Sequence, residues 1–248
     1  RVAEVLEENL DWERLEAVFA RWADRGSRAA VRLPTGVPLA VARDAAFCFT
    51  YGETLDALEA AGGTLRFFSP LEDAALPADA CGLYLPGGYP ELHAAKLSKN
   101  GEMRRSIREA VERGLPTVAE CGGFLYLGQS LEDGSGQSWP MAGVLPGAAV
   151  RKQKLVRFGY AELTAEQDSL LLRRGEAVPV HEFHYWDSSC NGTDLTARKP
   201  LTGRSWTCGF AGENLYAAFP HLYFAGRPEL AERFVRAAER WRDVHGVK

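Results

Sequence analysis

Cys121 is the residue of this sequence with the clearest chemical potential, because it stands in the segment Ala119–Gly123 (AECGG), between an apolar run and a helical pattern. A cysteine on a tight strand-to-helix turn points away from the core, and the helix N-terminus favours its thiolate form. Gly122 and Gly123 keep the turn open for a substrate, and the Gly122 N–H could donate to a developing oxyanion. We therefore predict a nucleophile at Cys121; a buried structural cysteine at a strand–helix junction is the alternative interpretation.

A second turn with exposed backbone amides is expected at Pro86–Gly88, in the segment YLPGGYPELH over residues 84–93. It follows another predicted parallel strand, and the carboxyl ends of parallel strands meet at one edge of a sheet, where ligands bind. This turn could therefore lie beside the Cys121 turn and complete an oxyanion hole. Taken alone, Pro-Gly-Gly is equally typical of an ordinary turn.

A cysteine nucleophile needs a base, and histidine is the usual one. Among the five histidines, His221 follows an apolar segment and Pro220, on a loop that is well placed to face a crevice. His181, Glu182 and His184 lie close together on a predicted strand, which is an unusual density of polar groups for a buried strand. A solvent-facing edge strand explains these three residues equally well.

The elements that position these residues alternate between strand and helix from residue 37 onward. The predicted strands are 38–43, 64–70, 81–86 and 115–120, and the predicted helices are 47–60, 91–98, 102–113 and 123–131. Such alternation with short loops indicates an α/β fold with a mostly parallel sheet that helices cover on both faces. Beyond residue 132, further strands are predicted at 155–163, 178–186, 205–210 and 214–219, before a last helix at 228–243.

The composition fits one α/β domain with a small appendage. The 248 residues are 46% hydrophobic and 25% charged, and a net charge of −4 gives no electrostatic case for binding nucleic acid or an anionic membrane. No apolar run reaches the ~20 residues that a membrane-spanning helix needs. The five cysteines form no C-x-x-C pair, so we expect no zinc site but reduced thiols, as in a cytoplasmic protein.

Residues 1–36 differ in texture from the rest of the chain. Apolar residues recur at helical spacing over residues 2–25, with Asp11 as a candidate cap, and residues 27–36 have the composition of a linker. The chain begins with Arg1 and shows no signal peptide, so we expect it to be a piece of a longer protein. We predict two parts, residues 1–36 and a domain over 37–248 that carries the candidate site.

Together, the AECGG turn, the Pro-Gly-Gly turn and the late His221 resemble the class I (triad-type) glutamine amidotransferases. Further segments narrow the resemblance to the cobyrinic acid a,c-diamide synthase family, of the cobyrinic/cobyric subgroup, and to its C-terminal glutaminase domain. They are RDAAFCFTY (43–51), FSPLED (68–73), LYLPGGYPELHAAKLSKN (83–100), MAGVLPG (141–147), HEFHY (181–185) and HLYFAGRPE (221–229). Residues 1–36 then look like the end of the family's preceding ATP-binding domain plus a linker.

The resemblance implies a flavodoxin-like glutamine amidotransferase domain with Cys121 as the nucleophile and His221 as its base. It implies that backbone N–H groups hold the oxyanion, and Gly88 and Gly122 are our candidates for these groups. Triad enzymes carry H-x-E, yet residue 223 is Tyr, so the carboxylate that would orient His221 is missing there. We hypothesise that Glu182 takes this orienting role.

The implied reaction is hydrolysis of glutamine, with ammonia passed to a corrinoid acid that is activated in a synthetase domain. The sequence has no G-x-x-x-x-G-K-S/T phosphate loop, so we expect ATP and Mg²⁺ to bind that other domain, and no cofactor or metal to bind this chain. Glutamine and the corrinoid acid are the expected partners, and a homodimer is a possible assembly. Cobyric acid synthase, nickel-sirohydrochlorin a,c-diamide synthase and a non-catalytic domain of the same fold are the alternatives.

Overall fold

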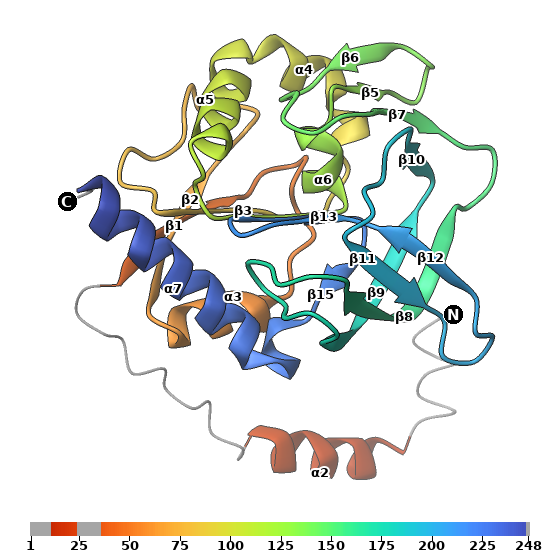
Figure 1. Cartoon of the computed structure of the whole chain (residues 1–248). Helices are drawn as coiled ribbons and strands as arrows, with labels where there is room; N and C mark the ends of the chain where they lie inside the picture. The colour runs from red at the N-terminus through yellow and green to blue at the C-terminus, as the bar shows by residue number, and fades with distance from the viewer. Residues whose placement is uncertain (1–10, 24–35, 247–248) are drawn as a thin grey trace. The chain divides into compact units, whose positions relative to one another are not determined.

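A computed structural model of the chain describes residues 11–23 and 36–246 (Figure 1). These residues belong to two units: α2 (Trp12–Ala23) lies in the first, and residues 36–246 lie in the second. The predicted cap of the first helix is confirmed, because the Arg14 N–H donates to Asp11 Oδ1 at 3.0 Å. Residues 1–10 and most of the predicted linker lie outside the described residues.

The second unit is built on a six-stranded sheet with the strand order β13-β14-β4-β3-β1-β2. Five strands run parallel; four of them are almost continuously buried, as expected of a sheet with both faces covered, whereas β2 at the edge is mostly half-buried or exposed. The five strands are β1 (Val37–Ala42), β2 (Gly63–Phe68), β3 (Gly82–Leu85), β4 (Thr117–Glu120) and β14 (Leu215–Ala218). The short β13 (Phe210–Ala211) pairs antiparallel at the edge. The prediction of a mostly parallel central sheet is therefore confirmed.

Helices cover both faces of this sheet (Figure 1). One face packs against α3 (Gly52–Ala60) and α7 (Pro228–His245), and the other against α6 (Gly122–Leu127), with α4 (Ala94–Lys99) and α5 (Gly101–Glu112) on the same side. Two short 3-10 turns, η1 (Pro90–Leu92) and η2 (Phe224–Gly226), precede α4 and α7. Two separate hydrophobic cores result, one on each face of the sheet. None of the helices in the described part of the chain is long and apolar enough to cross a membrane.

Two predicted helices are shorter than their apolar periodicity suggested. The helix predicted over 47–60 begins at Gly52, because the preceding residues turn back and pair with the Pro86–Gly88 segment: the Phe49 N–H donates to the Gly87 carbonyl at 3.1 Å. The helix predicted over 123–131 ends at Leu127, because Ser130–Glu132 forms a strand, β5. In both places tertiary pairing outweighs the local helical pattern.

Two further sheets follow the central one. The first has the order β10-β7-β5-β6 and contains β5, β6 (Ser138–Pro140), β7 (Ala148–Arg151) and β10 (Trp186–Ser188). The second has the order β12-β11-β8-β9-β15 and contains β8 (Arg157–Ala165), β9 (Ala177–His184), β11 (Leu195–Arg198), β12 (Ser205–Cys208) and the short β15 (His221–Leu222). The strand predicted over 178–186 is thus divided between β9 and β10, in two different sheets.

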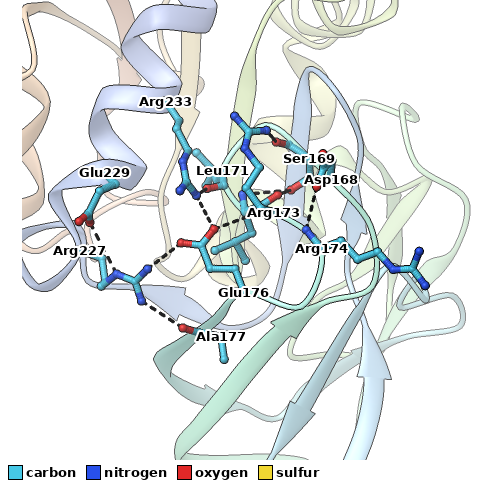
Figure 2. Close-up of polar contacts among 11 residues, drawn as sticks. Asp168, Ser169, Leu171, Arg173, Arg174, Glu176, Ala177, Arg227, Glu229 and Arg233 are labelled. Atoms are coloured by element: carbon cyan, nitrogen blue, oxygen red, sulfur yellow. Dashed lines mark hydrogen bonds and ion pairs between the residues drawn. The ribbon is translucent and has the colours of Figure 1, made fainter.

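An ion-pair network attaches the segment after β15 to the β8–β9 sheet (Figure 2). Glu176 accepts hydrogen bonds from Arg227 and Arg233, each at 2.6 Å, and Arg227 also donates to the Ala177 carbonyl at 3.1 Å. Burial alone would raise the pKa of Glu176, but the hydrogen bonds and charges of the arginines lower it below its usual value. The network therefore fixes the start of α7, and with it the chain that leaves His221.

Candidate active site

Cys121 lies on a strained turn between β4 and α6, as predicted. Its backbone has φ 48° and ψ −100°, and it is the only non-glycine residue with a positive φ in the ranges 11–23 and 36–246. The turn is held in place because the Cys121 N–H donates to the Ala218 carbonyl of β14 at 2.9 Å. Strained backbone at the end of a parallel strand is typical of a turn that presents a reactive side chain.

The two glycines after Cys121 are required by close packing. A Cβ at Gly123 would lie 2.1 Å from the Leu85 carbonyl oxygen, and one at Gly122 would lie 3.0 Å from the backbone nitrogen of Gly88. The first contact is with backbone, which cannot move aside without disturbing β3. The sequence therefore needs glycine at 122 and 123 to bring the Cys121 turn against the Pro86–Gly88 turn.

The Pro86–Gly88 turn lies beside Cys121 and His221, as the strand order predicted. Gly88 has φ +151°, and a Cβ there would lie 2.2 Å from the Ala46 carbonyl oxygen. A Cβ at Gly87 would lie 2.5 Å from His221 Cε1. Within the described residues, neither the Gly88 N–H nor the Gly122 N–H donates to a protein acceptor. Both amides are therefore available to an added oxyanion.

His221 is buried between two acidic partners. Its Nδ1 lies 3.4 Å from Glu120 Oε2, and the Cys121 thiol is the other acidic group near enough to influence the pKa of the imidazole. Burial acts to lower the pKa of His221, but the hydrogen bonds and charges of Cys121 and Glu120 outweigh it and raise the pKa from 6.5 to about 10. Because Nδ1 faces Glu120, Nε2 is the ring nitrogen left for Cys121. The structure thus brings together the two residues that the sequence singled out.

Glu120 is the site residue that the sequence reasoning missed. Its side chain is buried, with 1% of its surface exposed, and its Oε2 accepts from the Tyr84 hydroxyl at 3.2 Å. Its Oε1 accepts from the Leu222 N–H at 3.2 Å, so one carboxylate contacts both residues of β15. A charged residue at the last position of a buried strand, directly before Cys121, was the available signal, because a buried carboxylate requires partners.

Glu182 does not make the contact with His221 that we hypothesised. Its Oε1 lies 2.8 Å from Nε2 of His184, and its other oxygen has no hydrogen-bond partner among the described residues. The His184 ring stacks on Phe219, with 3.7 Å between the ring centroids. The alternation along β9 explains the difference: Glu182 and His184 point into the molecule, whereas His181 lies opposite His221 in the register. The carboxylate beside His221 is Glu120.

Tyr223 occupies the place where triad enzymes carry a carboxylate, and its side chain is 43% exposed. Its ring packs edge-on against Tyr51, with 5.5 Å between the centroids. Over residues 11–23 and 36–246, no group of three or more His, Cys, Asp or Glu side chains has an arrangement that could hold a metal ion. The site is therefore a thiol, an imidazole and a carboxylate in series, next to two free backbone amides.

Residues 38–229 match a family described as the CobB/CobQ-like glutamine amidotransferase domain. Similar sequences include a cobyrinate a,c-diamide synthase of Salmonella typhimurium, which is 43% identical over 88% of this chain and 48% of that protein. One of Synechococcus is 36% identical over 96% of this chain and 54% of that protein. The chain thus spans about half the length of these curated relatives.

Solved structures with a similar fold include PurLQS from Thermotoga maritima and a glutamine amidotransferase. The first has a TM-score of 0.55 and 18% sequence identity, and covers 83% of this chain and 99% of that one. The second also has a TM-score of 0.55 and 18% identity, and covers 82% of this chain and all of the other. At this identity the likeness concerns the fold alone, and it confirms the α/β amidotransferase fold that the sequence predicted.

Proposed function

Because the chain belongs to the CobB/CobQ-like glutamine amidotransferase domain family, we propose that it hydrolyses glutamine and releases ammonia for an amide ligase. The observation that carries this proposal is the series Glu120–His221–Cys121, which ends beside the N–H groups of Gly88 and Gly122. A raised pKa keeps His221 protonated at neutral pH, and an imidazolium stabilises the neighbouring thiolate.

In the first half of the reaction, the Cys121 thiolate attacks the side-chain amide carbon of glutamine, and the carbonyl electrons move onto the oxygen. The N–H groups of Gly88 and Gly122 hold that oxyanion. His221 then donates its Nε2 proton to the leaving nitrogen, the C–N bond breaks, and ammonia leaves behind a γ-glutamyl thioester on Cys121.

In the second half, neutral His221 accepts a proton from water, and the hydroxide attacks the thioester carbon. When the tetrahedral intermediate collapses, the C–S bond breaks, glutamate leaves, and the pair returns to thiolate and imidazolium. Glu120 touches no substrate in this scheme. It acts as a positioning residue, because it holds the proton on Nδ1 and so directs Nε2 towards Cys121.

The acceptor of the ammonia is proposed from the relatives. The Salmonella typhimurium and Synechococcus proteins are named cobyrinate a,c-diamide synthase. We propose that this chain is the glutaminase half of such a ligase, which amidates the a and c carboxylates of cobyrinic acid in cobalamin biosynthesis. ATP and Mg²⁺ would act in the other half of the protein, since this sequence has no phosphate loop. The alternatives are the glutaminase half of cobyric acid synthase or of nickel-sirohydrochlorin a,c-diamide synthase, and a non-catalytic domain of the same fold.

The test is release of glutamate from glutamine by this chain, compared with the variants Cys121→Ser and Cys208→Ser. Cys208 is a matched control because it is buried in β12, and burial raises the pKa of its thiol to about 12, which makes it unreactive. We expect hydrolysis to disappear in Cys121→Ser and to persist in Cys208→Ser. Equal hydrolysis by all three proteins would contradict the proposal. A Cys121 thiol that iodoacetamide does not alkylate would contradict it as well.

A further inference from the structure

The outer face of the β8–β9 sheet is unusually aromatic. Phe158 and Tyr160 of β8 and Phe183 of β9 have 63%, 76% and 46% of their surfaces exposed, and Tyr185 follows directly after β9. On the opposite side of the same strands lie Ala161, which belongs to the hydrophobic core, and the buried pair Glu182 and His184. We call these four side chains the aromatic face. An exposed apolar patch of this kind usually marks an interaction surface.

The side chains of the aromatic face pack against one another. The ring of Phe183 packs edge-on against Phe158 and Tyr185, with 5.8 Å between the centroids in both pairs. Beneath them, the Lys199 ammonium donates to the carbonyls of Phe158 and Tyr160, which fixes the backbone of β8. The face is therefore preorganised, so little side-chain entropy is lost when a partner covers it.

The aromatic face is continuous with the candidate active site. In the sheet register, Tyr160 lies opposite His181, and His181 lies opposite His221. Residues directly opposite each other project from the same side of a sheet, so His221 stands at the end of a row that begins at Tyr160. The Phe49 ring, also exposed, packs on His221 with 4.8 Å between the centroids. A partner that covers this face would therefore extend to the neighbourhood of His221.

We propose that the aromatic face docks the synthetase half of the ligase, that is, the part of the relatives' length that has no counterpart in this chain. This inference rests on the proposed function. The relatives are about twice as long as the region they share with this chain, so in those proteins a further part of similar size is covalently joined to that region. Ammonia released at Cys121 becomes ammonium in open water, so the synthetase half should seat close to Cys121 and His221, and the aromatic face adjoins His221 through the row of Tyr160 and His181.

Basic residues at the edge of the aromatic face indicate the charge expected on the synthetase half. Arg151, Lys152 and Lys154 are exposed just before β8, and the Lys152 N–H donates to the Tyr185 carbonyl at 2.8 Å. The docking surface of the synthetase half should therefore be apolar at its centre and acidic where it meets these basic residues.

The first experiment is hydroxyl-radical footprinting of this chain alone and of the chain fused to the part of the Salmonella typhimurium relative that it lacks. Leu201, 99% exposed between β11 and β12, is the reference side chain. We expect Tyr160 and Phe158 to be labelled in the isolated chain and protected several-fold in the fusion, with Leu201 labelled in both. Equal labelling in the two proteins would overturn the proposal. Protection in the isolated chain would also overturn it, in favour of a homodimer or of a cover formed by the chain's own first residues.

The second experiment compares the double variant Phe158→Ser/Tyr160→Ser with Leu201→Ser in the same fusion. The number of amides formed per glutamine hydrolysed should fall about tenfold or more in the double variant, as is typical when aromatic anchors of an interface are removed. Amidation supported by added ammonium should be kept in both variants. An unchanged ratio in the double variant would contradict docking at this face. If neither the isolated chain nor the fusion hydrolyses glutamine, the proposed function fails, whatever the footprint shows.

Discussion

Replacing Glu120 by Gln removes the one charge that contacts His221 Nδ1 while keeping the size of the side chain. The Gln carbonyl can still accept the Leu222 N–H, but its NH₂ group then faces Nδ1 and the Tyr84 hydroxyl, where a carboxylate oxygen had accepted hydrogen bonds. An NH₂ donor opposite Nδ1 favours the tautomer with its proton on Nε2. In this tautomer, Nε2 can no longer take a proton from water in the second half of the reaction.

The size of the effect follows from the contact. A hydrogen bond to a charged group contributes about 1.5–3 kcal/mol, and the 3.4 Å separation of Nδ1 and Oε2 is longer than a typical charge-assisted bond, which places it towards the lower end. We therefore expect the kcat of glutamine hydrolysis to fall by about 10-fold to 100-fold in Glu120→Gln. The KM for glutamine should change little, because Glu120 lies behind His221 and touches no substrate.

The pH profile separates positioning from a general loss of structure. Glu120 helps to raise the pKa of His221 to about 10, and the protonated ring is the acid of the first half-reaction, so activity is lost as the pH rises through this pKa. In Glu120→Gln the pKa of His221 should fall, and the alkaline limb of kcat should move to lower pH. A merely structural change would scale the rate without moving that limb.

Glu182→Gln is the matched control, since Glu182 is also a buried carboxylate paired with a histidine, but that histidine is His184. Steady-state assays of glutamate release from pH 6 to 11, with thermal unfolding of each variant, give all the required quantities. The reasoning is refuted if Glu120→Gln keeps the wild-type kcat, or if Glu182→Gln loses as much activity and shifts the same limb.

Two further predictions concern other positions of the fold. Gly123→Ala should destabilise the protein by about 3 kcal/mol and abolish glutamine hydrolysis, because the added Cβ would meet the Leu85 carbonyl. The control is Gly134→Ala, where the added Cβ has open space around it. It should change neither the denaturant titration nor the glutaminase assay. Glu91→Gln should stabilise the protein above pH 6. Burial, only partly offset by a backbone hydrogen bond, raises the pKa of Glu91 from 4.5 to about 6, so the folded state binds its proton more tightly and loses stability as the pH rises through this range. The shift corresponds to about 2 kcal/mol in the free energy of unfolding. Glu91→Gln should show this gain in denaturant unfolding at pH 7.5 and no gain at pH 4. A gain at both pH values would contradict the assignment.

The strands of the central sheet could be predicted because their local sequence pattern does not depend on which other segments they pair with. Segments such as 38–43 and 115–120 are short apolar runs between turn residues, and a strand with both faces buried requires that pattern wherever it lies in the sheet. The predicted start of the helix over 47–60 was wrong, because the Phe49 N–H donates a hydrogen bond to the carbonyl of Gly87, which lies in another turn. A pattern of local apolar spacing contains no information about such a partner.

The same distinction runs through the candidate site. Cys121 and His221 were found because each stands directly after a predicted strand and beside turn residues, and both signals are local. Glu120 was missed because its partner is 101 residues away, and their meeting depends on two tertiary facts. The first is that β14 lies beside β4, with Ala218 opposite Glu120; the second is that the chain then turns back within three residues to pair with β9.

The position of Glu120 also has a mechanical consequence. In H-x-E enzymes the orienting carboxylate follows the histidine on the same segment, whereas here it precedes the nucleophile on β4 and reaches across to β15. The nucleophile and the group that orients its histidine are therefore adjacent residues, on the turn after β4 and at the last position of β4, and only His221 arrives from a separate, short strand. Any shift of β15 would lengthen both of its contacts at once, with Cys121 and with Glu120. Because β15 pairs with β9, whose outer side carries part of the aromatic face, a partner seated on that face could change the reactivity of Cys121 without touching it.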